Sequence, residues 1–133
     1  MCIRDRPDLG KTPYESARPA TAATAATSST LAQTFNAELG VALQQIVASG
    51  AASVDYVDTY GLLDKAIASP SAYGFTNVTQ PLWTGSFTSS SSGTLAATGT
   101  GQSGYLFFDD LHPTAGGHAL LATSVTQTLT GTA

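Results

Sequence analysis

Residues 105–114 read YLFFDDLHPT, four apolar residues followed by a short polar turn and a Pro-Thr pair. The apolar run predicts a short buried strand over 105–108. The Pro-Thr pair predicts a helix starting near Pro113 or Thr114, because proline presets φ for a first helical turn and threonine accepts a hydrogen bond from a helical N–H. A strand, a turn and a helix in this order form the repeating unit of layered α/β folds. On one face the helix carries Leu121, Val125 and Leu129.

A long helix is predicted in the first half of the chain. It begins at a capping box formed by Thr30 and Gln33, and it ends at Gly50. Residues 18–29, rich in Ala, Thr and Ser, are expected to be a surface loop or the lead-in to this helix. Its apolar stripe, at spacings of four and three, consists of Leu31, Phe35, Leu39, Leu43 and Ile46.

The segment after Gly50 predicts a strand and a second helix. Residues 54–57 predict the strand, and Asp58 is placed to cap a helix over 60–68 that ends before Pro70. The alternation of helices and strands predicts the α/β class. Two or three short strands make too small a sheet to stand alone, so we expect the sheet to be incomplete.

Composition divides the chain into two parts. Residues 1–6 hold two of its three arginines and its only cysteine, and the composition changes abruptly at Pro7. The six residues resemble a translated sequencing-adapter leader. We therefore expect 1–6 to be a non-native leader and 7–133 to be the C-terminal part of one domain; a genuine polar N-terminus is the alternative. Residues 85–104 are mostly Gly, Ser and Thr and predict a flexible surface loop.

Charge and composition exclude several classes of protein. A net charge of −4 without a Lys/Arg cluster argues against a nucleic-acid partner. No apolar run reaches the about 18 residues of a membrane helix, and Cys2 alone can form neither an intrachain disulfide nor a thiolate metal cluster. Only 11% of the residues are charged. Such a composition is common in exported bacterial proteins, so we expect a secreted, periplasmic or cell-surface location for the intact protein.

Asp109 and His112 are the candidate catalytic residues. They lie three residues apart after a predicted strand, and active sites of open α/β sheets gather at that edge. A tight turn can place the Asp109 carboxylate against one ring nitrogen of His112, leaving the other nitrogen free to accept a proton from a nucleophile. From the spacing alone, a surface or capping role for His112 is the alternative.

The same turn resembles the last conserved block of the GDSL/SGNH hydrolases, and the resemblance extends over most of the chain after Pro7. The order and spacing of the blocks resemble the secreted and autotransporter esterase branch. The matching blocks are Asp109-x-x-His112-Pro113-Thr114 with Gly117-His118, and upstream Leu9-Gly10-x-Thr12-Pro13, Phe35-Asn36, Val57-Asp58 and Tyr73-Gly74-Phe75-x-Asn77-Val78.

The resemblance implies a Ser–His–Asp ester hydrolase with a three-layer α/β/α fold and a parallel sheet. His112 would be the general base and Asp109 its orienting partner, and the substrate would be a small-molecule or lipid ester. The family needs no metal and no organic cofactor. Its Gly-Asp-Ser and Gly-x-Asn-Asp blocks, which supply the nucleophile and the oxyanion hole, do not occur in this sequence. The resemblance therefore implies a C-terminal fragment that is inactive alone.

Other interpretations of single residues stay open from the sequence. Ser86 or residues 89–92 are poor candidates for a substitute nucleophile, because their segment has no positioned backbone donors. Asp109 and His112 with His118 would make a three-ligand metal site, although a packing role for His118 is favoured. Asp110 is expected to be a solvated neighbour or a partner within the turn.

Two wider alternatives remain. The chain would be a non-catalytic α/β binding module if it bound a ligand through its Ser/Thr/Gly-rich loop. An aromatic set would either line an acyl pocket or form a local packing cluster; it consists of Tyr73, Phe75 and Trp83.

Overall fold

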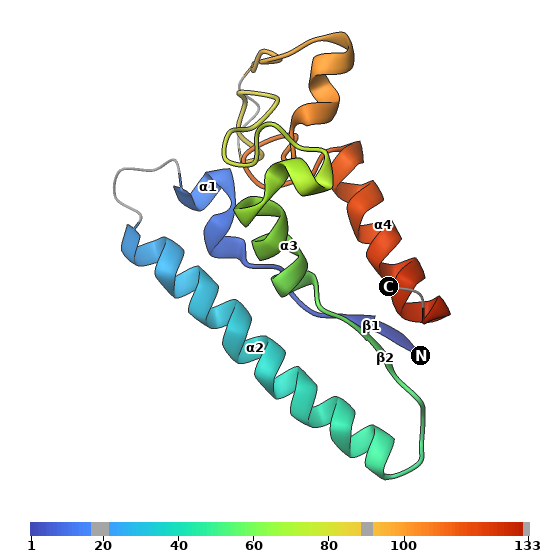
Figure 1. The fold of residues 1–133 in the computed structure, drawn as a ribbon. Coiled ribbons are helices and arrows are strands. Elements are labelled where there is room, and N and C mark those ends of the chain that lie inside the picture. The colour runs from blue at the N-terminus through green and yellow to red at the C-terminus, as the bar shows by residue number, and fades with distance from the viewer. Residues whose placement is uncertain (17–21, 89–91, 132–133) are drawn as a thin grey trace.

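The computed structural model describes residues 1–16, 22–88 and 92–131. Two short strands and four α-helices form its framework (Figure 1). In chain order these are β1 (Cys2–Arg4), α1 (Pro13–Ser16), α2 (Ala22–Ala48), β2 (Asp55–Val57), α3 (Thr59–Ala68) and α4 (Ala115–Thr130). Three 3-10 helices lie between them, at Leu9–Lys11, Pro70–Tyr73 and Gly99–Gly104. In the described part of the chain, no helix is long and apolar enough to cross a membrane.

The sheet is small and parallel. β1 pairs with β2 in a register that places Ile3 opposite Tyr56, and the two strands lie between α2 and α4 in Figure 1. Parallel strands need a crossover connection, and α2 supplies most of it. The predicted α/β class is confirmed. Within the described residues the sheet has two strands, so β1 leaves its other edge unpaired there.

Helix α2 begins earlier than the sequence pattern predicts. It starts at Ala22, so the predicted capping box is wrong: Thr30 lies inside the helix and donates its hydroxyl to the Ala26 carbonyl at 2.9 Å. Gln33 donates instead to the Tyr60 hydroxyl at 2.8 Å. The alanines of this stretch favour helix without any apolar periodicity, and its threonines bond back to carbonyls one turn earlier. Residues 18–21 of the expected loop lie outside the described residues.

The apolar stripe of α2 is only partly covered. Leu43 is buried, but Leu31 is 65% exposed and Phe35 is 44% exposed. The Arg6 guanidinium lies over the Phe35 ring, 4.5 Å from its centroid. The helix ends as predicted: Gly50 has a φ of +72°, a left-handed conformation that glycine adopts without the penalty of a Cβ.

Leu106 and Phe107 are buried as predicted, but Phe108 is 42% exposed and residues 105–108 do not form a strand. They make an isolated bridge between Tyr105 and Asn77, and another between Phe107 and Pro113. The neighbouring backbone at 77–83 is irregular, so it offers scattered hydrogen bonds instead of a ladder, such as Leu82 N–H to the Phe107 carbonyl at 2.9 Å. The core cluster around this segment consists of Phe75, Val78, Leu106 and Phe107, packed against Leu63, Ile67, Tyr73 and Leu120.

The last two helices follow their predicted boundaries closely. Asp58 caps α3 by accepting a hydrogen bond from Gly61 N–H at 2.7 Å. Thr114 caps α4 by accepting one from Gly117 N–H at 3.2 Å, and Pro113 lies just before this cap. Short polar residues at the N-cap satisfy backbone N–H groups that a helix cannot bond internally. The capping residues Asp58 and Thr114 therefore predict the starts of α3 and α4 correctly.

The Gly/Ser/Thr-rich segment is folded over an aromatic ring where it is described. Thr84 and Thr94 bond to each other through backbone and hydroxyl groups, which joins the start of the segment to its middle. Gly85 and Gly93 lie against the Trp83 indole, where a Cβ at either position would overlap the ring. Trp83 itself stacks on Phe108 with 6.3 Å between ring centroids. The predicted loop thus includes a packed part, and its residues 89–91 lie outside the described residues.

Residues 1–6 are built into the fold. The Asp5 carboxylate is 5% exposed and accepts hydrogen bonds from Thr59 N–H at 2.6 Å, Tyr60 N–H at 3.2 Å and the Tyr56 hydroxyl at 2.9 Å. The Asn36 side-chain amide pairs with both backbone groups of Arg6, at 2.9 and 2.8 Å. This packing joins β1 to α2 and α3. The non-native origin of residues 1–6 stays a prediction.

We expect Asp5→Ala to lower the free energy of unfolding by about 3 kcal/mol, because it leaves buried donors without their charged acceptor. Burial first, and then the hydrogen bond to Asp5, raises the pKa of Tyr56 to about 12. The variant should therefore also ionise Tyr56 at a lower pH, visible as tyrosinate absorbance. Asp55→Ala is the control, since it removes a carboxylate from β2 and keeps the Asp5 contacts. Equal urea midpoints for Asp5→Ala and this control would contradict the packing of β1.

Candidate active site

The candidate site is a tight turn that is pinned at both ends. Phe108 N–H donates to the His112 carbonyl at 2.7 Å and closes the turn. On the far side, Thr114 N–H donates to the Leu106 carbonyl at 2.9 Å, and the Thr114 hydroxyl donates to the Tyr105 carbonyl at 2.7 Å. The turn is therefore fixed between the buried core segment and the start of α4.

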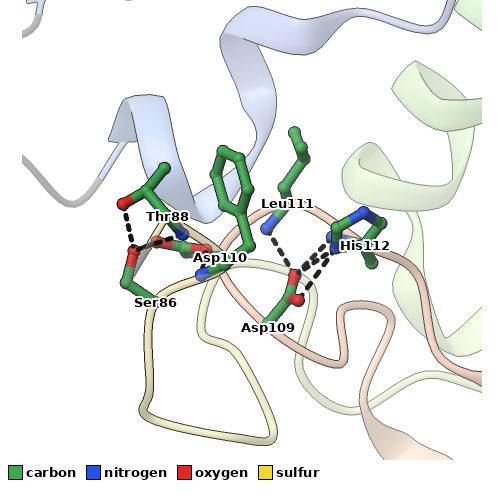
Figure 2. Close-up of polar contacts among 7 residues, drawn as sticks. Ser86, Thr88, Asp109, Asp110, Leu111 and His112 are labelled. Atoms are coloured by element: carbon green, nitrogen blue, oxygen red, sulfur yellow. Dashed lines mark hydrogen bonds and ion pairs between the residues drawn. The ribbon is translucent and has the colours of Figure 1, made fainter. Parts of the chain in front are cut away.

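The turn brings Asp109 and His112 together as the spacing predicts. His112 Nδ1 lies 2.8 Å from Asp109 Oδ2 and 3.1 Å from Oδ1. Oδ1 also accepts the backbone N–H of His112 at 2.6 Å and that of Leu111 at 2.9 Å. Figure 2 shows these contacts converging on one carboxylate. The aspartate thus holds the imidazole through both the ring and the backbone.

The two side chains differ sharply in exposure. The Asp109 side chain is 10% exposed and the His112 side chain is 60% exposed. Burial alone would raise the pKa of Asp109, but hydrogen bonds from the backbone N–H groups of His112 and Leu111, and then from the His112 ring, outweigh it and lower that pKa. An ionised Asp109 favours the tautomer of His112 that carries its proton on Nδ1. Nε2, at the far side of the ring, then carries the lone pair that a general base requires.

The serine near this turn serves another carboxylate. Ser86 donates its hydroxyl to Asp110 Oδ2 at 2.9 Å, and Phe87 N–H donates to Asp110 Oδ1 at 3.1 Å. Within the described residues, the hydrogen bonds of the His112 ring run to Asp109. The Asp110 carboxylate is thus a partner of Ser86 and Phe87, outside its own turn. Of the other serines considered as nucleophiles, residues 89–91 lie outside the described residues.

His118 does not join Asp109 and His112. It lies in the first turn of α4, where its Nδ1 donates to the Thr114 carbonyl at 3.0 Å. Among residues 1–16, 22–88 and 92–131, no three side chains of His, Cys, Asp or Glu are grouped to hold a metal ion. The arrangement of His118 therefore gives no support to the metal-site interpretation.

Two aromatic residues at the site were missed from the sequence. The ring of Phe87 lies edge-on to His112, with 5.8 Å between ring centroids and an interplanar angle of 88°. Tyr14 packs against Phe87, with 5.2 Å between centroids and an angle of 60°, and Tyr14 N–H donates to the Asp110 carbonyl at 2.6 Å. These contacts join segments far apart in the chain, and Phe87 is inconspicuous in a Ser/Thr/Gly-rich segment. No local pattern marks them.

The sequence matches one protein-family model. The model describes GDSL-like lipases and acylhydrolases, and the match runs over residues 3–125, which include Asp109, His112 and all of β1 except Cys2. A comparison with curated proteins finds no match.

We expect Asp109→Asn to destabilise the protein by roughly 2 kcal/mol near neutral pH, because it removes a charged acceptor from three N–H groups. The pKa of Asp109 is lowered by folding, so its contribution is fully present above its unfolded-state pKa of about 3.9 and is lost as the pH falls through the folded value. The difference in unfolding free energy between wild type and variant should therefore shrink from pH 5 to pH 2. Urea unfolding across that range measures it. A difference that does not change with pH would refute the proposed cause.

Proposed function

The chain belongs to the GDSL-like lipase/acylhydrolase family, and from that premise we propose that it carries the base and orienting half of an ester hydrolase site. His112 is the general base and Asp109 its orienting partner. The observation that carries this proposal is the contact of an exposed imidazole, through Nδ1 at 2.8 Å, with a buried carboxylate. Structural ion pairs on a surface usually have both partners solvated. Here the carboxylate is buried and the imidazole side chain is 60% exposed.

In the proposed reaction, a serine hydroxyl attacks the ester carbonyl while its proton passes to His112 Nε2. The resulting imidazolium is stabilised by ionised Asp109. It then returns the proton to the leaving alcohol as the tetrahedral intermediate collapses to an acyl-enzyme. Water repeats the sequence with Nε2 as base, and the acid is released. Each proton returns to solvent or product, so the cycle needs no cofactor.

The attacking hydroxyl is proposed to come from outside residues 1–133. The Gly-Asp-Ser block of the resemblance does not occur in this sequence, and the Ser86 hydroxyl bonds to Asp110. The chain alone should then be inactive, since a base and its orienter cannot perform acyl transfer without nucleophile and oxyanion donors.

A cavity beside the turn supports an uncharged acyl group as the part of the substrate that is bound. Its volume is about 450 Å³, within the range of small-molecule sites. Phe108 and Thr114, which flank the catalytic turn, belong to its wall. Every lining residue is uncharged: Leu82, Leu95, Gly99, Gln102, Ser103, Phe108, Thr114, Ala115 and Gly116. We therefore propose that the substrates are carboxylic esters with an apolar acyl chain, lipid esters among them. We also propose an exported location for the intact enzyme, because only 11% of the residues are charged.

The first test is turnover of p-nitrophenyl butyrate by the 133-residue chain. We expect no hydrolysis above that of its His112→Ala variant. Turnover by the chain that depends on His112 would overturn the proposal that the nucleophile lies elsewhere.

The second test uses a longer reading frame from the source DNA, extended upstream of codon 7 into a Gly-Asp-Ser block. Its kcat should fall on the order of 10⁴-fold in His112→Ala and in Asp109→Ala. His118→Ala is the matched control, because it truncates an exposed histidine that does not contact Asp109, and it should retain activity. An active extended enzyme that tolerates His112→Ala would contradict the assigned base. If the extended chain hydrolyses no ester, the binding-module interpretation replaces this one.

A further inference from the structure

The segment 86–88 lies against the candidate base. The ring of Phe87 is 39% exposed and stands at right angles to the His112 imidazole, with 5.8 Å between ring centroids. Edge-to-face pairs at this separation are attractive, because the positive edge of one ring meets the negative face of the other. Asp109 contacts His112 through the ring nitrogen Nδ1, whereas Phe87 contacts it ring to ring.

The position of Phe87 is set by Asp110. The Asp110 carboxylate accepts one hydrogen bond from the Ser86 hydroxyl at 2.9 Å and one from Phe87 N–H at 3.1 Å. Asp109 and Asp110 are neighbours in sequence, and their carboxylates turn to different partners: Figure 2 shows Asp109 bonded to His112 and Asp110 bonded to Ser86. In this one turn, the Asp109 carboxylate orients His112, and the Asp110 carboxylate holds the segment 86–88.

A third segment closes the arrangement from the far side of Phe87. Tyr14 of α1 packs edge-on to Phe87 at 5.2 Å, and its backbone N–H donates to the Asp110 carbonyl at 2.6 Å. Asp110 thus receives hydrogen bonds from both segments whose rings meet at Phe87. The order of the rings is Tyr14, Phe87, His112, and one residue of the catalytic turn fixes the backbone of the first two.

We propose that Phe87 is a positioning residue for His112, held in place by the Asp110 carboxylate. An imidazole that is 60% exposed and bonded at one nitrogen can still rotate about its side-chain bonds. The Phe87 ring restricts that rotation, so that Nδ1 stays on Asp109 and Nε2 keeps one direction. Its significance for ester hydrolysis rests on the proposed function, but the positioning itself is a property of this chain.

NMR of the 133-residue chain with ¹³C,¹⁵N-labelled histidine tests the proposal in mildly alkaline buffer. In the wild type, the His112 ring protons should be displaced from random-coil positions by the Phe87 ring current, and the Nδ1–H tautomer should dominate. In Phe87→Ala, we expect the displacement to disappear and the Nε2–H tautomer to gain population. Phe87→Tyr should restore both signals because it keeps the ring. Asp110→Asn should reproduce the loss in part, since its amide offers one acceptor oxygen instead of two.

Phe35→Ala is the matched control, because Phe35 is 44% exposed and lies on α2. It should leave the His112 signals unchanged. Phe87→Leu keeps an apolar side chain of similar size without the ring and should lose the ring-current displacement while the amide signals of the core stay in place. An unchanged His112 tautomer in both Phe87→Ala and Phe87→Leu would overturn the proposal.

Kinetics of the extended enzyme distinguish the two proposals. If both hold, Phe87→Ala lowers kcat on the order of 10-fold with little change in KM, because misorientation of the base acts on the chemical step. If the NMR changes occur but the extended enzyme hydrolyses no ester, the positioning role stands and the proposed function fails. If hydrolysis depends on His112 and the His112 tautomer does not respond to loss of the Phe87 ring, the proposed function stands and the positioning role fails.

Discussion

The arrangement of the site depends on one buried carboxylate that is surrounded by N–H groups of its own turn. Asp109 accepts the backbone N–H groups of Leu111 and His112 and the ring nitrogen of His112. Without that acceptor the turn would have unpaired donors beside the core, and the imidazole would lose the partner that defines its tautomer. Asp109 is buried and fully hydrogen-bonded within the turn, and this holds the exposed His112 ring in one orientation.

Two other buried aspartates of this chain, Asp5 and Asp8, also accept several hydrogen bonds from neighbouring segments. Asp5 accepts hydrogen bonds from the N–H and hydroxyl groups of Thr59 at the start of α3 and from the Tyr56 hydroxyl in β2. Asp8 accepts Gly10 N–H at 3.1 Å and the Tyr60 hydroxyl at 3.0 Å. In each case a buried carboxylate satisfies the backbone of a bend between elements, where no ladder of backbone bonds is available. Aspartates thus connect the segments that a two-stranded sheet is too small to organise.

How far the sequence predicts this structure depends on the distance over which each signal acts. The Asp109–His112 pair, the Asp58 cap of α3 and the start of α4 at Thr114 are local, and the sequence predicts them correctly. The early start of α2 was missed because alanine-rich helix lacks an apolar period. The apolar run at 105–108 predicts a strand, but its backbone is irregular: two of its apolar residues, Leu106 and Phe107, fill the core without strand pairing. Phe87 was missed because its partners are 73 residues earlier and 25 residues later.

The double attachment of Asp110 restricts how the loop at 86–88 can be exchanged for another. A replacement loop has to return two donors to the same carboxylate, a hydroxyl at position 86 and a backbone N–H at position 87. Proline at 87 is therefore excluded, whatever its effect on the loop's conformation. Threonine at 86 keeps the hydroxyl, and position 88 carries no bond to this carboxylate. Any grafting of loops onto this scaffold to alter its specificity has to keep those two donors, and the proposed role of Phe87 adds an aromatic ring at position 87 to what has to be kept.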